Sequence, residues 1–271
     1  MSLIPCAMTI AGSDSGGGAG IQADLRTFAF HCVHGACAIT CVTAQNTVGV
    51  MRVDALPLDS ISAQIEAVVT DIPVLAVKTG MLLNSEIIRL TAKKLTALGF
   101  SNLVVDPVMV SRTGAQLIDD QAITTLKQQL LPIAKIITPN RYEAQILANM
   151  PIHTLEDMQK SAQIIHKLGA RTVLVKGGSM PSDLRGVDVY FDGETFTTLR
   201  TEMVNTPHTH GTGCTLSSAI AANLALGKPL SSAIHLAKQY VTEALKHALA
   251  IGKGQGPVGH YYPLLRMQAW V

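Results

Sequence analysis

The feature that most constrains the fold of this chain is a set of six short apolar runs. Each run is followed by glycine or polar residues and then by helix-forming residues. The runs end at Ile10, Thr43, Lys78, Val105, Ile137 and Lys176. Buried runs of this length are typical of parallel strands, and most of the segments between them carry apolar residues at helical spacing. Alternating strands and helices predict an α/β fold with a mostly parallel sheet and helices on both faces.

The rest of the pattern predicts a small hairpin and a single domain. Asp192-Gly193 separates two further apolar runs, 187–191 and 195–199, and Asp-Gly is a strong hairpin signal. No low-complexity segment, charge block or internal repeat divides the 271 residues, so we expect one domain over residues 1–271. Ligands of open α/β sheets bind outside the carboxyl ends of the strands, which is where the polar motifs fall.

The composition narrows the class of partner. Hydrophobic residues make up 48% of the chain and charged residues 15%, which predicts a large buried core. A formal net charge of +2 and 4% aromatic residues give no reason to expect nucleic acid or an anionic membrane as partner. The first ten residues lack a basic region, and five cysteines without a CxxC pair fit free thiols. We therefore expect a cytoplasmic protein.

A glycine-rich segment, 206–214, precedes helix-forming residues that continue without a breaker to Gly227. Thr212 is a candidate helix cap, and Gly211 and Gly213 let a ligand approach the backbone. The first amides of a helix carry partial positive charge and lack intrahelical partners, so a phosphate or a developing oxyanion suits them. The alternative is a tight loop before an ordinary helix. Cys214 is either an apolar filler or a reactive thiol.

A second glycine-rich segment, 16–20, follows the first predicted strand. Residues 18–23 fit the dinucleotide fingerprint, which requires an acidic residue after the next strand. Gln45-Asn46 occupies that position, which argues against NAD(P), and the chain contains no P-loop sequence. A loop that closes over a substrate remains.

Two polar side chains near this loop are candidates for substrate binding. Asp24 lies in the following helix, where it either complements the helix dipole or hydrogen-bonds a substrate. Gln45 follows the neighbouring strand. A carboxylate and an amide at adjacent strand ends suit a nitrogen heterocycle that carries an amino group.

The later strands end in residues suited to a metal and a phosphate. Asp106 precedes a proline, and Asn140 and Glu143 point to one side of a short helix. Magnesium takes such oxygen ligands and uses few carboxylates, although each residue is also a plausible helix cap. Lys176 ends the sixth run. A lysine and two carboxylates, Asp106 and Glu143, at one edge of the sheet indicate a site that binds a metal ion together with a phosphate. His210, in the glycine-rich segment 206–214, either lines the pocket or has a structural role.

Together these motifs resemble the ribokinase-like superfamily, and within it the hydroxymethylpyrimidine/phosphomethylpyrimidine kinases of thiamine biosynthesis. The resemblance runs from Thr9 to His260 and implies a three-layer sandwich and a homodimer. Its intermediate motifs are Val42–Thr47, Lys78–Met81, Val105–Val108, Ile137–Glu143, Val175–Gly178 and His208–Cys214. The glycine-rich tail, 252–260, either covers the nucleotide or is a frayed end.

The resemblance implies that MgATP phosphorylates 4-amino-5-hydroxymethyl-2-methylpyrimidine and then its monophosphate to the diphosphate. The residues that correspond to pyrimidine-binding positions are Gly12, Asp24, Gln45, Met81 and Val108. Those on the ATP side are Asn140, Lys176, His210 and Thr212. Asp106 and Glu143, together with Asn140, correspond to the magnesium network, and Gly211 and Gly213 to the anion hole, with Lys176 and Cys214 also catalytic.

Cys214 replaces the catalytic aspartate that most sugar kinases of the superfamily carry. Phosphoryl transfer relies mainly on positioning and charge stabilisation. The acceptor of the second step is already an anionic phosphate, which needs no base. We therefore expect Cys214 to assist the first phosphorylation and tolerate the second. Two alternatives remain: a pyridoxal or pyridoxine kinase of the same fold, and a non-catalytic pyrimidine-binding regulatory module.

Overall fold

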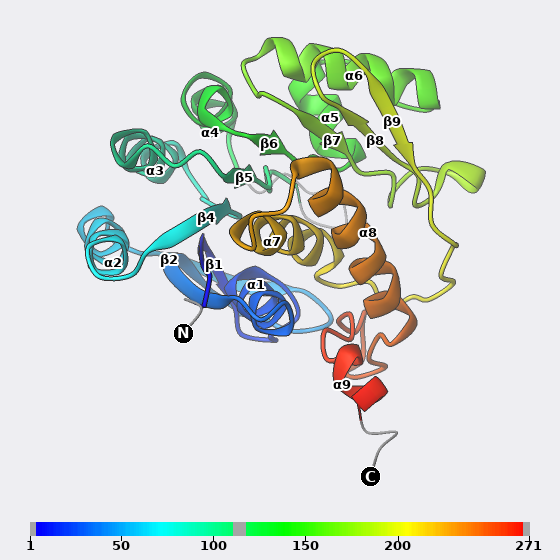
Figure 1. Cartoon of the computed structure of the whole chain (residues 1–271), viewed down its shortest axis with the longest axis horizontal. Coiled ribbons are helices and arrows are strands. Elements are labelled where there is room, and N and C mark those ends of the chain that lie inside the picture. The colour runs from blue at the N-terminus through cyan, green and yellow to red at the C-terminus, as the bar shows by residue number, and fades with distance from the viewer. Residues whose placement is uncertain (1–3, 111–117, 268–271) are drawn as a thin grey trace. The chain divides into compact units, whose positions relative to one another are not determined.

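The computed structural model describes residues 4–110 and 118–267, which fall into two compact units (Figure 1). The first unit contains the chain up to Lys78 and again from Val204 onwards, and the second contains Thr79–Met203. Both units combine strands and helices, as the alternating pattern predicts. The expectation of one domain over residues 1–271 stays a prediction.

The first unit contains strands in the order β3-β2-β1-β4. Strands β1 (Cys6–Asp14) and β2 (His34–Gln45) run parallel, β4 (Val74–Thr79) neighbours β1, and β3 (Val50–Ala55) pairs antiparallel with β2 at the edge. The apolar runs correctly predict β1, β2 and β4. Strand β3 was not predicted, because all six of its residues are exposed and leave no buried face in the sequence.

Helices pack on these strands from both sides. In Figure 1, α2 (Leu58–Val69) lies to the left of β1, β2 and β4, while α1 (Gly20–Phe30), α7 (Thr212–Ala225) and α8 (Leu230–Lys246) lie to the right. Helix α7 contacts α1, α8 and β1, and it is buried from Thr215 to its end. The last described helix is α9 (Tyr262–Met267). A helix packed this closely has little freedom to shift.

The second unit has three short parallel strands and a hairpin. The parallel strands are β5 (Leu103–Val105), β6 (Ile136–Ile137) and β7 (Val173–Val175), followed by the antiparallel strands β8 (Asp188–Phe191) and β9 (Phe196–Leu199). The Asp-Gly signal thus correctly predicts the hairpin. All residues of β5, β6 and β7 are buried, as expected for parallel strands.

The helices of the second unit begin at residues whose side chains cap them. They are α3 (Ser85–Leu98), α4 (Asp120–Thr125), α5 (Arg141–Ala148) and α6 (Leu155–Lys167), with short helical turns η1 (Leu126–Leu130), η2 (Leu131–Ile133) and η3 (Ser182–Leu184). The Asn84 side chain accepts the amide of Ile87, and Thr154 forms a capping box with Asp157. These side chains satisfy backbone amides that lack intrahelical partners, which accounts for where the helices begin.

Two opposite charges are fully buried in the first unit. Both oxygens of Asp24 accept hydrogen bonds from Lys78 Nζ, at 3.0 and 2.8 Å, and neither side chain is exposed to solvent. The hydroxyls of Thr9 and Ser218 donate to the same carboxylate at 2.6 and 2.5 Å. Asp24 is the fifth residue of α1, beyond its first turn. The helix-dipole interpretation of Asp24 is therefore wrong, because its carboxylate is held by protein donors beyond the first turn. Its predicted contact with a substrate stays a prediction.

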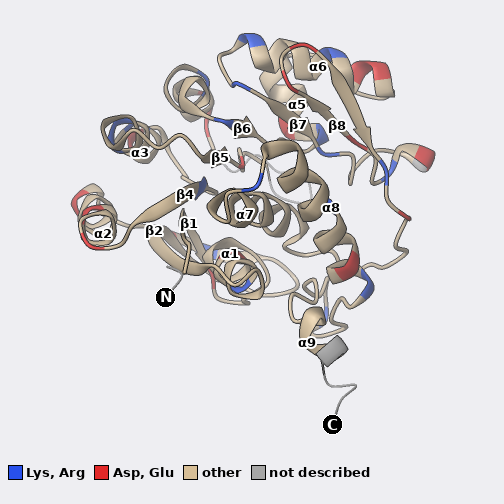
Figure 2. Ribbon diagram, viewed as in Figure 1, with Lys and Arg blue, Asp and Glu red and all other residues tan. Residues whose placement is uncertain are grey.

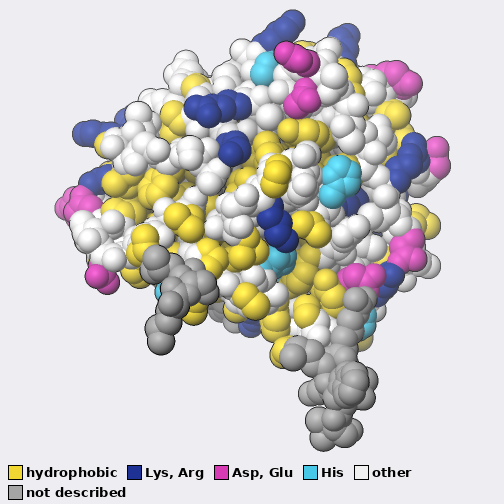
Figure 3. Space-filling model, viewed as in Figure 1, with side chains coloured by type: hydrophobic (Ala, Val, Ile, Leu, Met, Phe, Trp, Pro, Cys, Tyr) yellow, Lys and Arg dark blue, Asp and Glu magenta, His cyan; other side chains and the backbone are white. Residues whose placement is uncertain are grey.

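Other charged residues lie on helices such as α2, α3 and α6 and on the segments that join the elements (Figure 2). On the face drawn in Figure 3, basic and acidic side chains are interspersed among hydrophobic and uncharged ones. Mixed charges of this kind create no extended basic field for a polyanion. None of the helices in the described ranges is long and apolar enough to cross a bilayer.

We predict that Lys78→Met lowers the free energy of unfolding by about 3–5 kcal/mol, because it leaves the Asp24 carboxylate buried without its cation. Urea unfolding followed by circular dichroism measures the change. Arg52→Met is the matched control, since Arg52 forms an exposed ion pair with Asp54. The midpoint of the control should stay near that of the wild type. Equal losses in the two variants would show that burial of the pair is not what matters.

Candidate active site

The start of α7 presents backbone amides at a glycine-rich turn. Gly211 occupies the cap position with φ of 83°, and the helix begins at Thr212. The amide and hydroxyl of Thr212 both donate to the carbonyl of Thr209, at 3.3 and 2.6 Å. Thr212 is therefore not the helix cap, and that prediction is wrong. Among the described residues, the amides of Gly211 and Gly213 have no protein acceptor, so they can bind an anion.

The anion loop, residues 208–214, packs directly against the glycine loop, residues 15–19. A Cβ atom added to Gly211 would lie 1.8 Å from the carbonyl oxygen of Gly18. A Cβ atom added to Gly18 would lie 2.2 Å from Cδ2 of His210. Because neither position can hold a side chain without displacing the other loop, glycine at both is a requirement of this packing.

Asp14 organises the glycine loop, although the sequence analysis missed it. Its carboxylate accepts the amides of Gly16, Gly18 and Ala19 at 2.9, 3.0 and 2.8 Å. Nε2 of His210 lies 2.8 Å from Asp14 Oδ2. Burial raises the pKa of Asp14, but the hydrogen bonds from His210 and the backbone outweigh it and hold the pKa below its usual range. The available signal was an acidic residue between the first apolar run, which ends at Ile10, and the glycine loop.

Gln45 lies at the carboxyl end of β2, beside this loop. Its backbone amide donates to Ser15 Oγ at 2.8 Å, and the Ser15 hydroxyl donates to its carbonyl at 2.7 Å. The side-chain Nε2 lies 3.4 Å from Nε2 of His210. Gly12, also predicted near the pyrimidine, is buried within β1. The structure thus brings Gln45 and His210 together, whereas the family resemblance implies a place for His210 on the nucleotide side.

The C-terminal strap, residues 254–260, holds the anion loop from the other side. The Gly256 carbonyl accepts the His210 amide at 3.2 Å, and the Val258 amide donates to the His210 carbonyl at 3.1 Å. Nε2 of His260 lies 2.8 Å from the hydroxyl of Thr215 in α7. The alternative of a frayed end is therefore wrong for residues 254–260, because their backbone is hydrogen-bonded to both the amide and the carbonyl of His210.

The second unit gathers charged groups at the carboxyl ends of β5, β6 and β7. Lys176 Nζ donates to Asp106 Oδ1 at 2.8 Å, and both side chains are largely buried. The hydroxyl of Thr138, a residue missed in the sequence, lies 3.3 Å from the same oxygen. Thr138 directly follows the run that ends at Ile137, which is the position that identified the other candidates.

Glu143 and Asn140 form a capping box at the start of α5. Asn140 Oδ1 accepts the Glu143 amide at 3.0 Å, and Glu143 Oε2 accepts the Asn140 amide at 2.7 Å. Burial, with a smaller contribution from the charge of Asp106, raises the pKa of Glu143 to about 8 against the opposing charge of Lys176. The interpretation of Asn140 and Glu143 as helix caps is confirmed. Ionising Glu143 places a second negative charge near Asp106, which is unfavourable unless a further positive charge binds there.

Met81 and Val108 follow β4 and β5 in the second unit. Both side chains are half-buried. The segments that carry them are joined by a hydrogen bond of 2.9 Å, which the Asp106 amide donates to the carbonyl of Thr79. The structure therefore places the two predicted pocket residues on neighbouring turns. Their role in lining the pyrimidine pocket stays a prediction.

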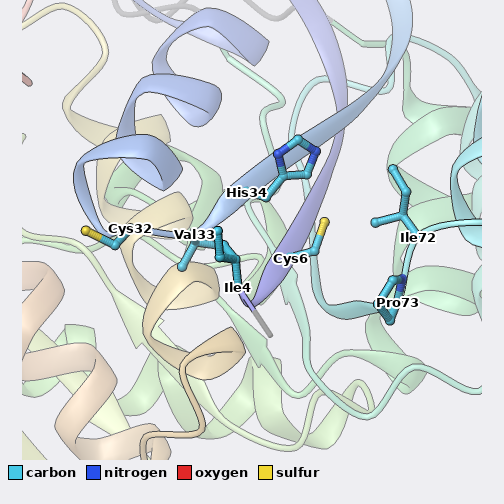
Figure 4. Close-up of a pocket in the computed structure, with 7 residues that line it drawn as sticks. All are labelled: Ile4, Cys6, Cys32, Val33, His34, Ile72 and Pro73. Carbon is cyan, nitrogen blue, oxygen red and sulfur yellow. The ribbon is translucent and has the colours of Figure 1, made fainter. Parts of the chain in front are cut away.

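A pocket lies at the other end of the strands of the first unit (Figure 4). Its lining consists of Ile4, Cys6, Cys32, Val33, His34, Ile72 and Pro73. Cys6 and His34 begin β1 and β2, so the pocket faces the amino ends of these strands. Since the polar motifs follow the carboxyl ends, this largely apolar pocket is separate from the candidate site.

Comparison with known proteins identifies close relatives. The family model described as phosphomethylpyrimidine kinase matches residues 14–259. A Synechococcus elongatus protein named hydroxymethylpyrimidine/phosphomethylpyrimidine kinase is 60% identical over 261 residues, which cover 96% of this chain and 99% of that protein. Both comparisons span the glycine loop, the charged cluster and the anion loop.

Solved structures give the same fold. The Bacillus subtilis pyridoxal kinase in its ADP complex has a TM-score of 0.91 and 41% identity, covering 97% of this chain and 99% of that one. The Staphylococcus aureus pyridoxal kinase with AMP-PCP and pyridoxal has a TM-score of 0.87 and 37% identity, covering 96% and 94%. These likenesses confirm the predicted ribokinase-like α/β fold.

We predict that His260 makes stability depend on pH. Burial, and secondarily the charge of Arg26, lowers its pKa to about 4, whereas an unfolded histidine titrates near 6.5. The unfolded chain therefore binds a proton first, so the contribution is complete above pH 6.5 and declines by up to about 3 kcal/mol towards pH 4. Urea unfolding at several pH values measures this loss.

The comparison of variants isolates the contribution of His260. The stability difference between wild type and His260→Gln should shrink as the pH falls from 7 to 4. His235→Gln, at an exposed histidine of α8, should show no such trend. A constant difference for His260→Gln would contradict a buried neutral imidazole.

Proposed function

The chain belongs to the phosphomethylpyrimidine kinase family, and we propose that it phosphorylates 4-amino-5-hydroxymethyl-2-methylpyrimidine and then its monophosphate with ATP. The observation that carries this proposal is the anion loop. There, the amides of Gly211 and Gly213 lack protein acceptors in the described part of the chain and stand at the positive end of α7. Such donors stabilise the charge of a migrating phosphoryl group at little reorganisation cost. The product of the second step is the diphosphate needed for thiamine diphosphate synthesis.

We assign the ATP phosphates to a set of residues at strand ends and at the anion loop. Lys176 supplies a cation at the end of β7, and Thr212 with Gly213 supplies the first turn of α7. Asn140 belongs to the same group from the sequence, although its side-chain oxygen caps α5. Support comes from the relatives solved with ADP and with AMP-PCP.

We propose that magnesium is held near Asp106 and Glu143. Both side chains are buried, and each raises the cost of a negative charge on the other, which a divalent cation relieves. The described residues include no cluster of three or more His, Cys, Asp or Glu ligands. That fits magnesium, which keeps several waters and needs few carboxylates. When bound, the ion supplies charge neutralisation for the phosphates.

We assign the pyrimidine to Gln45, with Gly12, Met81 and Val108 as lining positions. The Gln45 amide is half-buried at the end of β2 and can pair with a ring nitrogen and an amino group. The likeness to pyridoxal kinases keeps phosphorylation of pyridoxal as the second candidate activity. Side-by-side rates with the two heterocycles separate the candidates, and a large preference for pyridoxal would favour the second.

We also propose a homodimer in the cytoplasm. All five cysteines are free thiols, which suits a reducing compartment. Strand β3 is an edge strand, and Val48, Val50 and Met51 expose 72, 48 and 73% of their surface around it. An apolar strand edge of this kind readily pairs with a second copy.

We predict that Cys214→Ala slows the first phosphorylation by about a hundredfold, as expected when a proton acceptor is lost, and the second far less. A coupled assay that separates the monophosphate from the diphosphate measures both rates. Cys37→Ala, at a half-buried cysteine of β2, is the control and should retain both rates. Equal losses in the two steps would refute a base role for Cys214.

We predict that light scattering gives the wild type twice the 28.7 kDa mass of the chain. Met51→Glu places a charge on the exposed edge and should shift the mass towards one chain. Leu75→Glu, at another exposed apolar residue, is the control and should remain dimeric. A wild-type mass near 28.7 kDa would rule out the dimer.

A further inference from the structure

Three side chains of the first unit meet next to the glycine loop. Nε2 of His210 lies 2.8 Å from Asp14 Oδ2 and 3.4 Å from Nε2 of Gln45. The side chains of Asp14 and His210 are 4 and 15% exposed, so little water competes for these contacts. One imidazole nitrogen therefore stands between a carboxylate and an amide.

The carboxylate determines which proton this nitrogen carries. Asp14 already accepts three backbone amides, and its pKa lies below the usual range, so it is ionised and can only accept hydrogen bonds. At 2.8 Å, Nε2 of His210 must then be protonated, whether the imidazole is neutral or charged. A protonated Nε2 is a donor and cannot accept a hydrogen bond from Gln45.

The donor on His210 in turn orients the Gln45 amide. With Nε2 of Gln45 facing His210, two N–H groups oppose each other. A half-turn of the amide places Oε1 towards His210 instead, where it accepts the shared Nε2–H. The same turn brings the NH2 group towards Thr43, whose hydroxyl lies 3.3 Å from that end of the amide. Since Thr43 donates its proton to the Ser13 carbonyl at 2.9 Å, its oxygen can accept from the NH2 group.

We propose that His210, held by Asp14, is a specificity-determining positioning residue that fixes the hydrogen-bonding direction of the Gln45 amide. The acceptor end of the amide lies at His210 and the donor end at Thr43. A substrate must therefore offer a donor on the His210 side and an acceptor on the Thr43 side. This inference rests on the assignment of Gln45 to the pyrimidine in the proposed function.

The direction of the amide selects one class of pyrimidine. An aminopyrimidine presents an exocyclic NH2 donor next to a ring-nitrogen acceptor, which matches the fixed amide. Its 4-oxo analogue presents an acceptor next to a ring N–H donor, so both partners are reversed. Burying two mismatched polar pairs is costly, and the site should reject the oxo compound.

The test measures dissociation constants by calorimetry for the 4-amino-5-hydroxymethyl-2-methylpyrimidine and its 4-oxo analogue, together with kcat/KM for each. The wild type should prefer the amino compound. In His210→Leu the preference should fall by about tenfold or more, because the amide is free to turn. In His210→Gln, which retains a side-chain N–H donor, much of the preference should return.

A control separates positioning from a general effect on the loop. His208→Leu alters the neighbouring histidine, whose Nδ1 accepts the Gly256 amide at 3.0 Å, and should keep the wild-type preference. A preference unchanged in a folded His210→Leu, or lost equally in His208→Leu, would overturn the proposal. If the wild type showed no turnover, the proposed function would be contradicted. The role of His210 would still be tested by the ratio of the dissociation constants for the amino and oxo compounds.

Discussion

The contact between the backbones of Gly18 and Gly211 is the constraint on which the first unit depends. It joins the loop after the first strand to the turn that begins α7, two segments from opposite ends of the chain. With no side chain between them, the two loops approach closely enough that the amides of the anion loop are fixed by backbone packing. Preorganised amides of this kind stabilise developing charge without first having to be oriented.

The side chains around this contact maintain it. Asp14 holds three amides of the glycine loop and the ring of His210, while the C-terminal strap bonds the backbone of His210. Further along α7, Ser218 donates to the buried Asp24, whose charge is balanced by Lys78. Because these bonds are buried or partly buried, removing one leaves a polar group with few alternative partners and weakens the arrangement.

Much of the fold was predictable because its signals are local. Apolar runs marked the buried strands, and Asp192-Gly193 marked the hairpin. Strand β3 escaped because an exposed edge strand needs no apolar face. Thr212 was misjudged because Gly211 adopts the left-handed cap conformation and moves the threonine into the helix.

The candidate site was predictable by position but less so by contact. The strand-end rule located Asp106, Gln45 and Lys176, and glycine spacing located the anion loop. The ion pair of Asp24 was not predictable, because its partner Lys78 lies in β4, far along the chain, and no local pattern reveals the pair. The position of Asp14 before the glycine loop was visible in the sequence, but its contact with His210, far along the chain, was not.

A crystal structure with the aminopyrimidine and a non-hydrolysable ATP analogue tests the central claim most directly. We expect an oxygen of the terminal phosphate to lie within about 3 Å of the amide nitrogen of Gly211 or Gly213. Phosphates bound elsewhere, with both amides facing water, would contradict the account.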